Sequence, residues 1–380
     1  MKVIKFGSVT GNKIFPEKIR EARVARVLSQ SQLSELVGVS SQAISQYEKG
    51  YSVPNPSVVL RLVDVLDFPI SFFSNSSINK SEKGDIVYFR ANKNITKKLQ
   101  DACKVRIEWI NNTYSMLNKY FMLPKVDIPN FGNIDIEALD LIAIEEIANE
   151  LREYWKLGEG PIVNLIDVLQ ENGIVITKLK INNKKIDGFS TWKKGIPYIF
   201  IENEKGSAVR SRFNLAHELG HLILHSGLNE EEVDEYKTII EDQANQFAGA
   251  FLLPRESFNS EIISSSIDSF VLLKRKWVVS IGAMVKRAQD TEMLTENQIR
   301  YLKSQMIKYG YYKKEPMDDY IKPEKPYLFK QAFELLIDNN IMDKETLLEV
   351  LGINKTEAIF LYSLKDDFFD RTTNILTLVK

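Results

Sequence analysis

Short apolar stretches at helical spacing fill the first 73 residues. In Glu17–Leu28 the apolar positions recur every three residues, close to the period of an α-helix. Three further helices are predicted, at Leu33–Val37, Ser40–Gly50 and Val58–Leu66. The hydroxyls of Ser29 and Ser40 can cap the second and third helices, and Gly38 and Gly50 can end them. This pattern predicts an all-α domain.

A polar segment and a long helix come next. Ser74–Asp85 contains few apolar side chains and is predicted to be a linker. From Leu99 to Phe121 the apolar residues are spaced by threes and fours, which predicts one helix with a single apolar stripe. Such a stripe can pack on an adjacent domain or form a dimer contact. The break in LPKVDIPNFG then marks a domain boundary.

Helices and strands alternate beyond this boundary. Asp135–Trp155 is a predicted helix, and Pro161 suits the first turn of another helix that ends at Glu171. Strands are predicted at IVITKLKI, GFSTW and PYIFIEN, the last two joined by a KKG turn. Helical spacing returns from about Ser207 and dominates up to residue 315. A last helical segment lies at 327–368, after a proline-rich break.

Composition excludes several protein classes. The 380 residues are 44% hydrophobic and 27% charged, which is ordinary for globular proteins and sufficient for two or three domains. No apolar run reaches the ~20 residues that span a bilayer, and the N-terminus lacks the apolar core of a signal peptide. The single cysteine, Cys103, permits no internal disulfide. We therefore expect a cytoplasmic protein that does not enter a membrane.

Charge is distributed unevenly along the chain. Residues 1–130 carry 19 Lys and Arg against 11 Asp and Glu, whereas the remainder carries 31 against 40, although the net charge is only −1. A basic first third on an acidic body is compatible with an N-terminal nucleic-acid-binding module.

The chain has three histidines, and all lie in LAHELGHLILH, between Leu215 and His225. His217, Glu218 and His221 form an HExxH motif. Four residues along a helix rotate the side chain by about 40°, so the two imidazoles lie on one side, one turn apart. They can then bind one Zn²⁺, while Glu218 can act as a general base. The alternative is a pair of solvent-facing histidines.

A zinc peptidase needs a third protein ligand. His225 is eight residues beyond His217, roughly 12 Å along a straight helix, which is too far to share one ion easily. Glu241, in IIEDQANQFAGAFLLP, lies at the edge of an apolar helix face, whereas Asp242 points nearly opposite. A carboxylate turned toward the interior is costly unless it is paired or binds a metal. We therefore expect Glu241 as the ligand; an ordinary carboxylate near a helix N-terminus is the alternative.

Ser29–Gly50 has the order of a helix-turn-helix. Ser41, Gln42 and Gln46 are expected to be exposed near the start of its second helix. Glutamine can read adenine in the major groove, and serine can contact phosphate. Gln30 also suits a phosphate contact. Because the second helix carries little positive charge, we expect a homodimer on a double-stranded operator with two half-sites. A domain used only for protein contacts is the alternative.

These segments carry a family resemblance. Ser29–Gly50 resembles the Cro/C1 (XRE-type) helix-turn-helix, and FNLAHELGHLILH with IEDQANQFAGAFLLP resembles the ImmA/IrrE family of zinc metallopeptidases. The resemblance covers nearly the whole chain and is weakest beyond Pro326. It implies a zincin-like fold. The family's zinc and catalytic residues match His217, Glu218, His221 and Glu241.

The resemblance also implies a function. The family's characterised role is cleavage of a DNA-binding repressor, which derepresses genes in mobile elements or stress responses. Fusion of the helix-turn-helix to the peptidase leaves the substrate open. The alternatives are a transcription regulator whose peptidase-like domain senses a ligand or partner, and a toxin or phage-defence protease.

A multidomain fold follows from these segments. We predict an all-α helix-turn-helix domain, a linker with a long connecting helix, an α+β zincin-like metallopeptidase domain and a small helical C-terminal unit. Their predicted bounds are 1–73, 74–130, 131–315 and 316–380.

Overall fold

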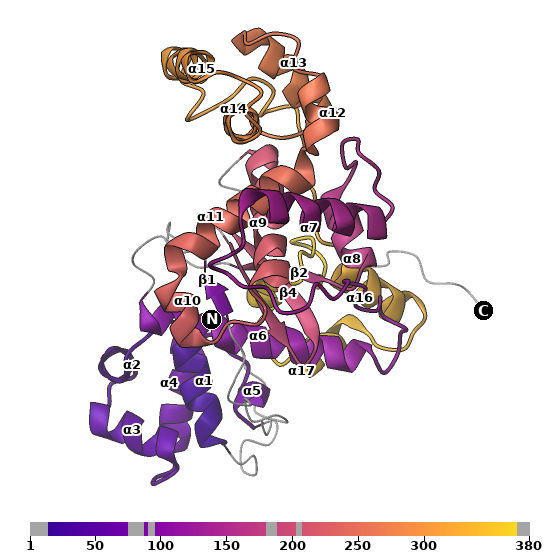
Figure 1. Cartoon of the computed structure of the whole chain (residues 1–380). Coiled ribbons are helices and arrows are strands. Elements are labelled where there is room, and N and C mark those ends of the chain that lie inside the picture. Colours follow the sequence, from indigo (N-terminus) through magenta and orange to yellow (C-terminus); the bar gives the residue numbers. More distant parts are fainter. Residues whose placement is uncertain (1–13, 75–86, 90–95, 180–187, 203–206, 371–380) are drawn as a thin grey trace, which may run out of the picture. The chain divides into compact units, whose positions relative to one another are not determined.

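The structure, a computed structural model, consists of two compact units (Figure 1). It describes residues 14–74, 87–89, 96–179, 188–202 and 207–370. The helical unit contains the described residues of 1–83, 94–122 and 329–380. The mixed unit contains those of 84–93 and 123–328. A helical domain that precedes a mixed, helix-rich one confirms the predicted multidomain organisation. The four predicted boundaries stay a prediction, and the predicted linker beyond Ser74 lies outside the described residues.

Four short helices open the helical unit, as the sequence pattern predicts. They are α1 (Pro16–Ala25), α2 (Gln30–Val37), α3 (Ser41–Lys49) and α4 (Pro56–Leu66). The hydroxyls of Ser29 and Ser40 accept hydrogen bonds from the first turns of α2 and α3, and both helices end at a glycine with positive φ. Helix α1 ends three residues before the predicted Leu28, and Val27 beyond it adopts positive φ.

The helical unit also contains the long helix and the C-terminal helices. These are α5 (Ile70–Ser74), α6 (Lys97–Leu117), α16 (Leu328–Asp338), α17 (Lys344–Leu351) and α18 (Lys355–Leu361). One carboxylate links α18 to α6 and to the end of α1, because Glu357 accepts from Arg106 of α6 and from Arg26, the residue after α1, both at 2.9 Å. Trp109 of α6 donates to Glu21 of α1 at 2.6 Å. Helices from both ends of the chain therefore share one unit with the helix-turn-helix.

A four-stranded sheet forms the β layer of the mixed unit. Its strands are β1 (Val87–Phe89), β2 (Val175–Leu179), β3 (Gly188–Lys193) and β4 (Ile196–Glu202), and their order is β1-β3-β4-β2. Among the described strands, β2 and β4 pair in parallel, whereas β1 with β3 and β3 with β4 pair antiparallel. Lys194 and Gly195 both have positive φ, which is the backbone of a tight type I′ hairpin between β3 and β4. The three strands predicted from sequence are thus β2, β3 and β4; β1 was not predicted.

Nine helices are described in the mixed unit. They are α7 (Leu141–Tyr154), α8 (Leu165–Glu171), α9 (Ala208–Leu224), α10 (Glu230–Glu235), α11 (Lys237–Leu252), α12 (Arg255–Ser260), α13 (Ile267–Trp277), α14 (Ile281–Asp290) and α15 (Glu296–Lys308). Two predicted starts were wrong. Asp140 caps α7 by accepting from Ala143 N, so the helix begins six residues after Asp135. Asn164 caps α8 in the same way, so Pro161 lies outside that helix.

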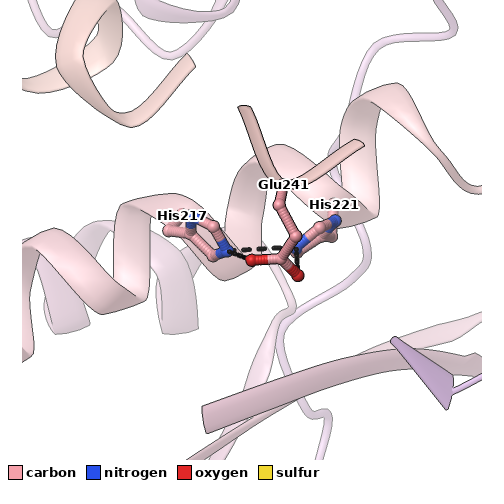
Figure 2. Close-up of side chains that lie close together, drawn as sticks. All are labelled: His217, His221 and Glu241. Atoms are coloured by element: carbon pink, nitrogen blue, oxygen red, sulfur yellow. Dashed lines mark hydrogen bonds and ion pairs between the residues drawn. The ribbon is translucent and has the colours of Figure 1, made fainter. Parts of the chain in front are cut away.

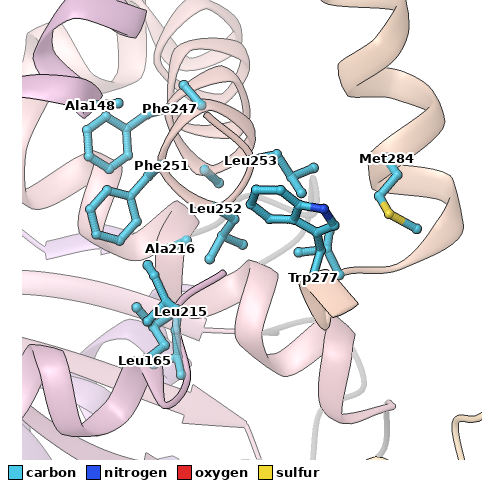
Figure 3. Close-up of a cluster of buried hydrophobic side chains, with 14 of the residues drawn as sticks. Ala148, Leu165, Leu215, Ala216, Phe247, Phe251, Leu252, Leu253, Trp277 and Met284 are labelled. Atoms are coloured by element: carbon cyan, nitrogen blue, oxygen red, sulfur yellow. The ribbon is translucent and has the colours of Figure 1, made fainter. Parts of the chain in front are cut away.

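The largest apolar core of the mixed unit is built around α9 and α11. Helix α9 packs on strands β3 and β4, and α11 packs on α9 and α7. Figure 3 shows α9 and α11 contributing side chains that meet those of α13 and α14. The labelled examples are Leu215, Ala216, Phe247, Phe251, Leu252, Trp277 and Met284. The HExxH motif therefore lies on a helix that packs on the sheet on one side and on α11 on the other.

In the part of the chain that the structure describes, no helix is both long and apolar enough to cross a membrane.

Candidate metal centre and nucleic-acid interface

Helices α9 and α11 bring three potential metal ligands together (Figure 2). The Nε2 atoms of His217 and His221 lie 3.1 Å apart. One carboxylate oxygen of Glu241 lies 3.6 Å from His217 Nε2, and the other lies 3.6 Å from His221 Nε2. Figure 2 shows the carboxylate of Glu241 reaching down from α11 to the two imidazoles. The three side chains thus converge on one point.

The donor set and its spacing fit zinc. Ligand distances of ~2.0–2.1 Å around a tetrahedral ion place neighbouring ligand atoms about 3.3–3.4 Å apart. The observed separations of 3.1 and 3.6 Å bracket this value. His217 and His221 are buried, whereas the Glu241 side chain is 22% exposed, so the cluster lies at the edge of the core. Two imidazoles and one carboxylate are ordinary ligands of a catalytic zinc.

The close approach of α11 to α9 depends on Gly220, inside the HExxH motif. A Cβ at Gly220 would lie 3.1 Å from the Phe247 ring and 3.2 Å from the Cα of Ala244. These contacts are too tight for most real Cβ atoms, and one of them is to backbone. A glycine on α9 and an alanine on α11 therefore let the two helices approach closely enough for Glu241 to reach the histidines.

Gly220→Val is expected to weaken this helix contact. Two added methyl groups and a Cβ must displace α11, and overpacking of this kind costs about 1–3 kcal/mol of unfolding free energy. Urea unfolding of the full chain measures the change. Gly227→Val is the matched control, because no atom beyond those of its chain neighbours lies within 4 Å of a Cβ built at Gly227. Equal stability of the two variants would contradict the role of Gly220.

Each histidine of the cluster is oriented through its other ring nitrogen. His217 Nδ1 lies 2.9 Å from Asn245 Oδ1, and His221 Nδ1 lies 2.9 Å from His225 Nδ1. His225 in turn contacts Gln243 Oε1 through its Nε2 at 3.2 Å. Burial, and then the charge of His221, lower the pKa of His225 to about 3. His225 thus contacts His221 on the ring nitrogen that faces away from Glu241.

Glu218 is buried between α9 and the sheet. A Cβ at Gly188, the first residue of β3, would lie 3.2 Å from Glu218 Oε1 and 3.0 Å from the carbonyl oxygen of Phe200. The absence of a side chain at Gly188 therefore leaves the room in which this carboxylate sits. Strand β3 and the HExxH helix together form the surroundings of the candidate general base.

Sequence reasoning missed three residues of this site. Gln243 and Asn245 contact the histidines from α11, and Gly188 accommodates Glu218 from β3. Asn245 lies four residues after Glu241, so helical spacing could have placed both on one face. No comparable local signal marks Gly188, because its contact with Glu218 spans 30 residues and depends on the packing of α9 on the sheet.

The four predicted DNA-contacting residues lie on α2 and α3. Gln42 and Gln46 are exposed on α3, and Ser41 is half-buried at its first position. Gln30 is half-buried and donates from Nε2 to Glu48 Oε2 at 2.8 Å, which ties α2 to α3. Glu48 also pairs with Arg23 of α1. The arrangement leaves the two α3 glutamines most accessible to a base edge.

Comparison with known families now adds to this geometry. A family model for the helix-turn-helix matches residues 19–73, which contain Gln30, Ser41, Gln42 and Gln46. A family model for the IrrE N-terminal-like domain, Peptidase_M78, matches residues 169–289, which contain His217, Glu218, His221 and Glu241. No curated protein matches the chain. The two matches agree with the fusion that the sequence resemblance predicted: residues 19–73 are similar to the XRE-type helix-turn-helix, and residues 169–289 are similar to the ImmA/IrrE family.

Proposed function

We propose that this protein is a DNA-binding regulator with zinc-dependent endopeptidase activity, and that it cleaves a repressor. The observation that carries the proposal is the convergence of His217, His221 and Glu241 beside a buried Glu218. Two imidazoles and a carboxylate suit a catalytic zinc, and the glutamate next to the first histidine suits a general base. A zincin-like fold, with the ligands on two packed helices beside a sheet, is part of the proposal.

In the proposed mechanism, His217, His221 and Glu241 hold the metal. Zinc, when bound, supplies a Lewis acid that polarises the scissile carbonyl and lowers the pKa of water. Glu218 accepts a proton from the attacking water at a carboxylate oxygen and later delivers it to the leaving amine nitrogen. The burial of Glu218 keeps competing water away from this proton transfer.

The helix-turn-helix is proposed to hold the protein at an operator. The exposed Gln42 and Gln46 suit base contacts in the major groove, while Ser41 and Gln30 suit phosphate contacts. Binding of a homodimer to two half-sites would compensate for the low positive charge of α3, where Lys49 is the one Lys or Arg. A repressor bound near the same operator would then be an accessible substrate.

Gln46→Ala is expected to weaken binding to the preferred DNA by about 1–3 kcal/mol, because one bidentate base contact is lost. The preferred sequence is first selected from random duplexes with the wild-type chain. Dissociation constants for that sequence and a scrambled duplex are then compared at one salt concentration. Binding to the scrambled duplex should be unchanged, and an equal loss on both duplexes would show that Gln46 does not read a base.

Cleavage is tested by comparing protein N termini in cells that express the wild-type chain or the Glu218→Gln variant. The proposal predicts new N termini within a DNA-binding repressor, in wild-type cells alone. If gene regulation is equal in both strains and no wild-type-specific N terminus is found, the peptidase-like domain instead acts as a sensor. Cleavage of an essential host protein with growth arrest would instead identify a toxin or defence protease.

A further inference from the structure

A buried chain of hydrogen bonds runs from the protein backbone to the candidate metal centre. Gln243 Nε2 donates to the carbonyl oxygens of Ile136 at 2.8 Å and Leu139 at 3.1 Å. Gln243 Oε1 lies 3.2 Å from His225 Nε2, and His225 Nδ1 lies 2.9 Å from His221 Nδ1. Gln243, His225 and His221 are all at most 4% exposed.

The backbone carbonyl groups determine the orientation of the Gln243 side-chain amide. A carbonyl oxygen can only accept a hydrogen bond, so both backbone contacts require the amide nitrogen of Gln243 to face Ile136 and Leu139. The amide oxygen of Gln243 must then face His225. Because that oxygen also only accepts, the proton of this contact has to be on His225 Nε2.

The protonation of His225 also determines which nitrogen donates in its contact with His221. A neutral imidazole carries a proton on one ring nitrogen, so protonation of Nε2 leaves a lone pair on Nδ1 of His225. The contact between the two Nδ1 atoms therefore requires His221 Nδ1 to be the donor. With its proton on Nδ1, His221 has a lone pair on Nε2, which is the atom 3.6 Å from Glu241.

We propose that Gln243 and His225 are positioning residues that set the tautomer of His221. Through them, the carbonyl groups of the 136–139 segment keep the proton of His221 on Nδ1 and present its Nε2 lone pair to the metal. The inference rests on the metal site of the proposed function, although it does not depend on which substrate is cleaved or whether cleavage occurs.

The tautomer of His221 affects how tightly it can bind a metal. A free histidine side chain prefers its proton on Nε2, the tautomer that would block the ligand atom of His221. An acceptor at Nδ1 reverses that preference, and partners of this kind commonly change metal affinity 10–100-fold. His217 has a different partner at its Nδ1, Asn245 Oδ1, at 2.9 Å. The two histidines of the motif therefore have separate Nδ1 partners, although their Nε2 atoms also lie 3.1 Å from each other.

The tautomers can be observed directly in the metal-free full-length chain. Selective ¹⁵N labelling of histidine produces only three imidazole spin systems, since the chain contains three histidines. Long-range ¹H–¹⁵N correlation at mildly alkaline pH distinguishes protonated from unprotonated ring nitrogens. We expect the proton on Nδ1 of His221 and on Nε2 of His225. A His221 proton on Nε2 would overturn the proposal.

Variants at two positions test this relay of hydrogen bonds, which runs from the backbone carbonyl groups through Gln243 and His225 to His221. His225→Phe fills the site but offers no acceptor, so zinc affinity, measured by competition with a chelator, should fall about 10–100-fold. His225→Asn can place its Oδ1 where His225 Nδ1 lies, and it should keep the affinity within a few-fold of wild type. Gln243→Met should give His221 a mixture of tautomers. Equal affinity of His225→Phe and wild type, equal losses in the Phe and Asn variants, or an unchanged tautomer in Gln243→Met would each contradict the relay.

Failure of the relay and failure of the proposed peptidase give different results. A protein with the expected tautomers and the expected zinc-affinity series, but no cleavage product in cells, keeps the relay and loses the endopeptidase. A protein that cleaves a repressor but carries the His221 proton on Nε2 keeps the endopeptidase and loses the relay. The wild-type tautomer measurement decides the question even if a variant fails to fold.

Discussion

Glu218→Gln is expected to bind zinc as the wild type does and to lose at least about 100-fold, and up to ~10⁴-fold, in cleavage rate. The amide has nearly the shape of the carboxylate but cannot accept the proton of the attacking water. The ligand atoms of His217, His221 and Glu241 are untouched by the change. Zinc per chain is measured on the purified full-length protein, and cleavage is measured on the repressor identified from wild-type-specific N termini.

Two controls make this result specific to the carboxylate. Thermal unfolding should show that the variant is folded. This control is needed because Glu218 is buried beside Gly188, where an amide could disturb the packing. Glu231→Gln, a matched change at an exposed position of α10, should keep full activity. Undiminished cleavage by Glu218→Gln would reject the proposed mechanism, whereas loss of zinc in that variant would assign Glu218 to the metal site instead.

Glu241→Ala is expected to lower zinc affinity by more than about 100-fold. It removes one of three protein ligands, whereas loss of a partner behind a ligand already costs 10–100-fold. Both histidines should remain in place, because their rings are held by Asn245 and His225. Chelator competition measures the affinity, and cleavage should fall with it at limiting zinc.

Asp242→Ala is the matched control for this ligand. Asp242 is the next residue on α11 and is exposed. Its substitution therefore also deletes a carboxylate but leaves His217, His221 and Glu241 unchanged. Zinc affinity should remain at the wild-type value. Equal affinities for Glu241→Ala and Asp242→Ala would exclude Glu241 as a ligand and reopen the search for the third one.

Local rules in the sequence predicted much of the secondary structure. Serine caps and glycine stops predicted the ends of α2 and α3 accurately, because the groups that satisfy a helix end lie within a few residues of it. The same rules misplaced the starts of α7 and α8. Asp135 and Pro161 each suit a first helical turn by local rules, but Asp140 and Asn164 are the residues whose side chains accept the capping hydrogen bonds.

The candidate ligands could also be read from the sequence. HExxH places His217 and His221 one helical turn apart whatever surrounds the helix. Glu241 could be singled out because a carboxylate on an apolar helix edge needs a partner. Both arguments use one helix at a time, and neither shows how closely the two helices approach.

Tertiary packing decided the rest of the site. Gly220 sets the approach of α11 to α9, Gly188 leaves room for Glu218, and the carbonyl groups of Ile136 and Leu139 orient Gln243. The contacts of Gln243 with these two carbonyl groups join residues more than 100 positions apart. By itself the sequence determined which side chains could bind a metal or a base edge, because helical periodicity and capping act over a few residues. Only the tertiary structure decided how His221 is oriented, because that orientation depends on a contact chain that closes when distant segments pack together.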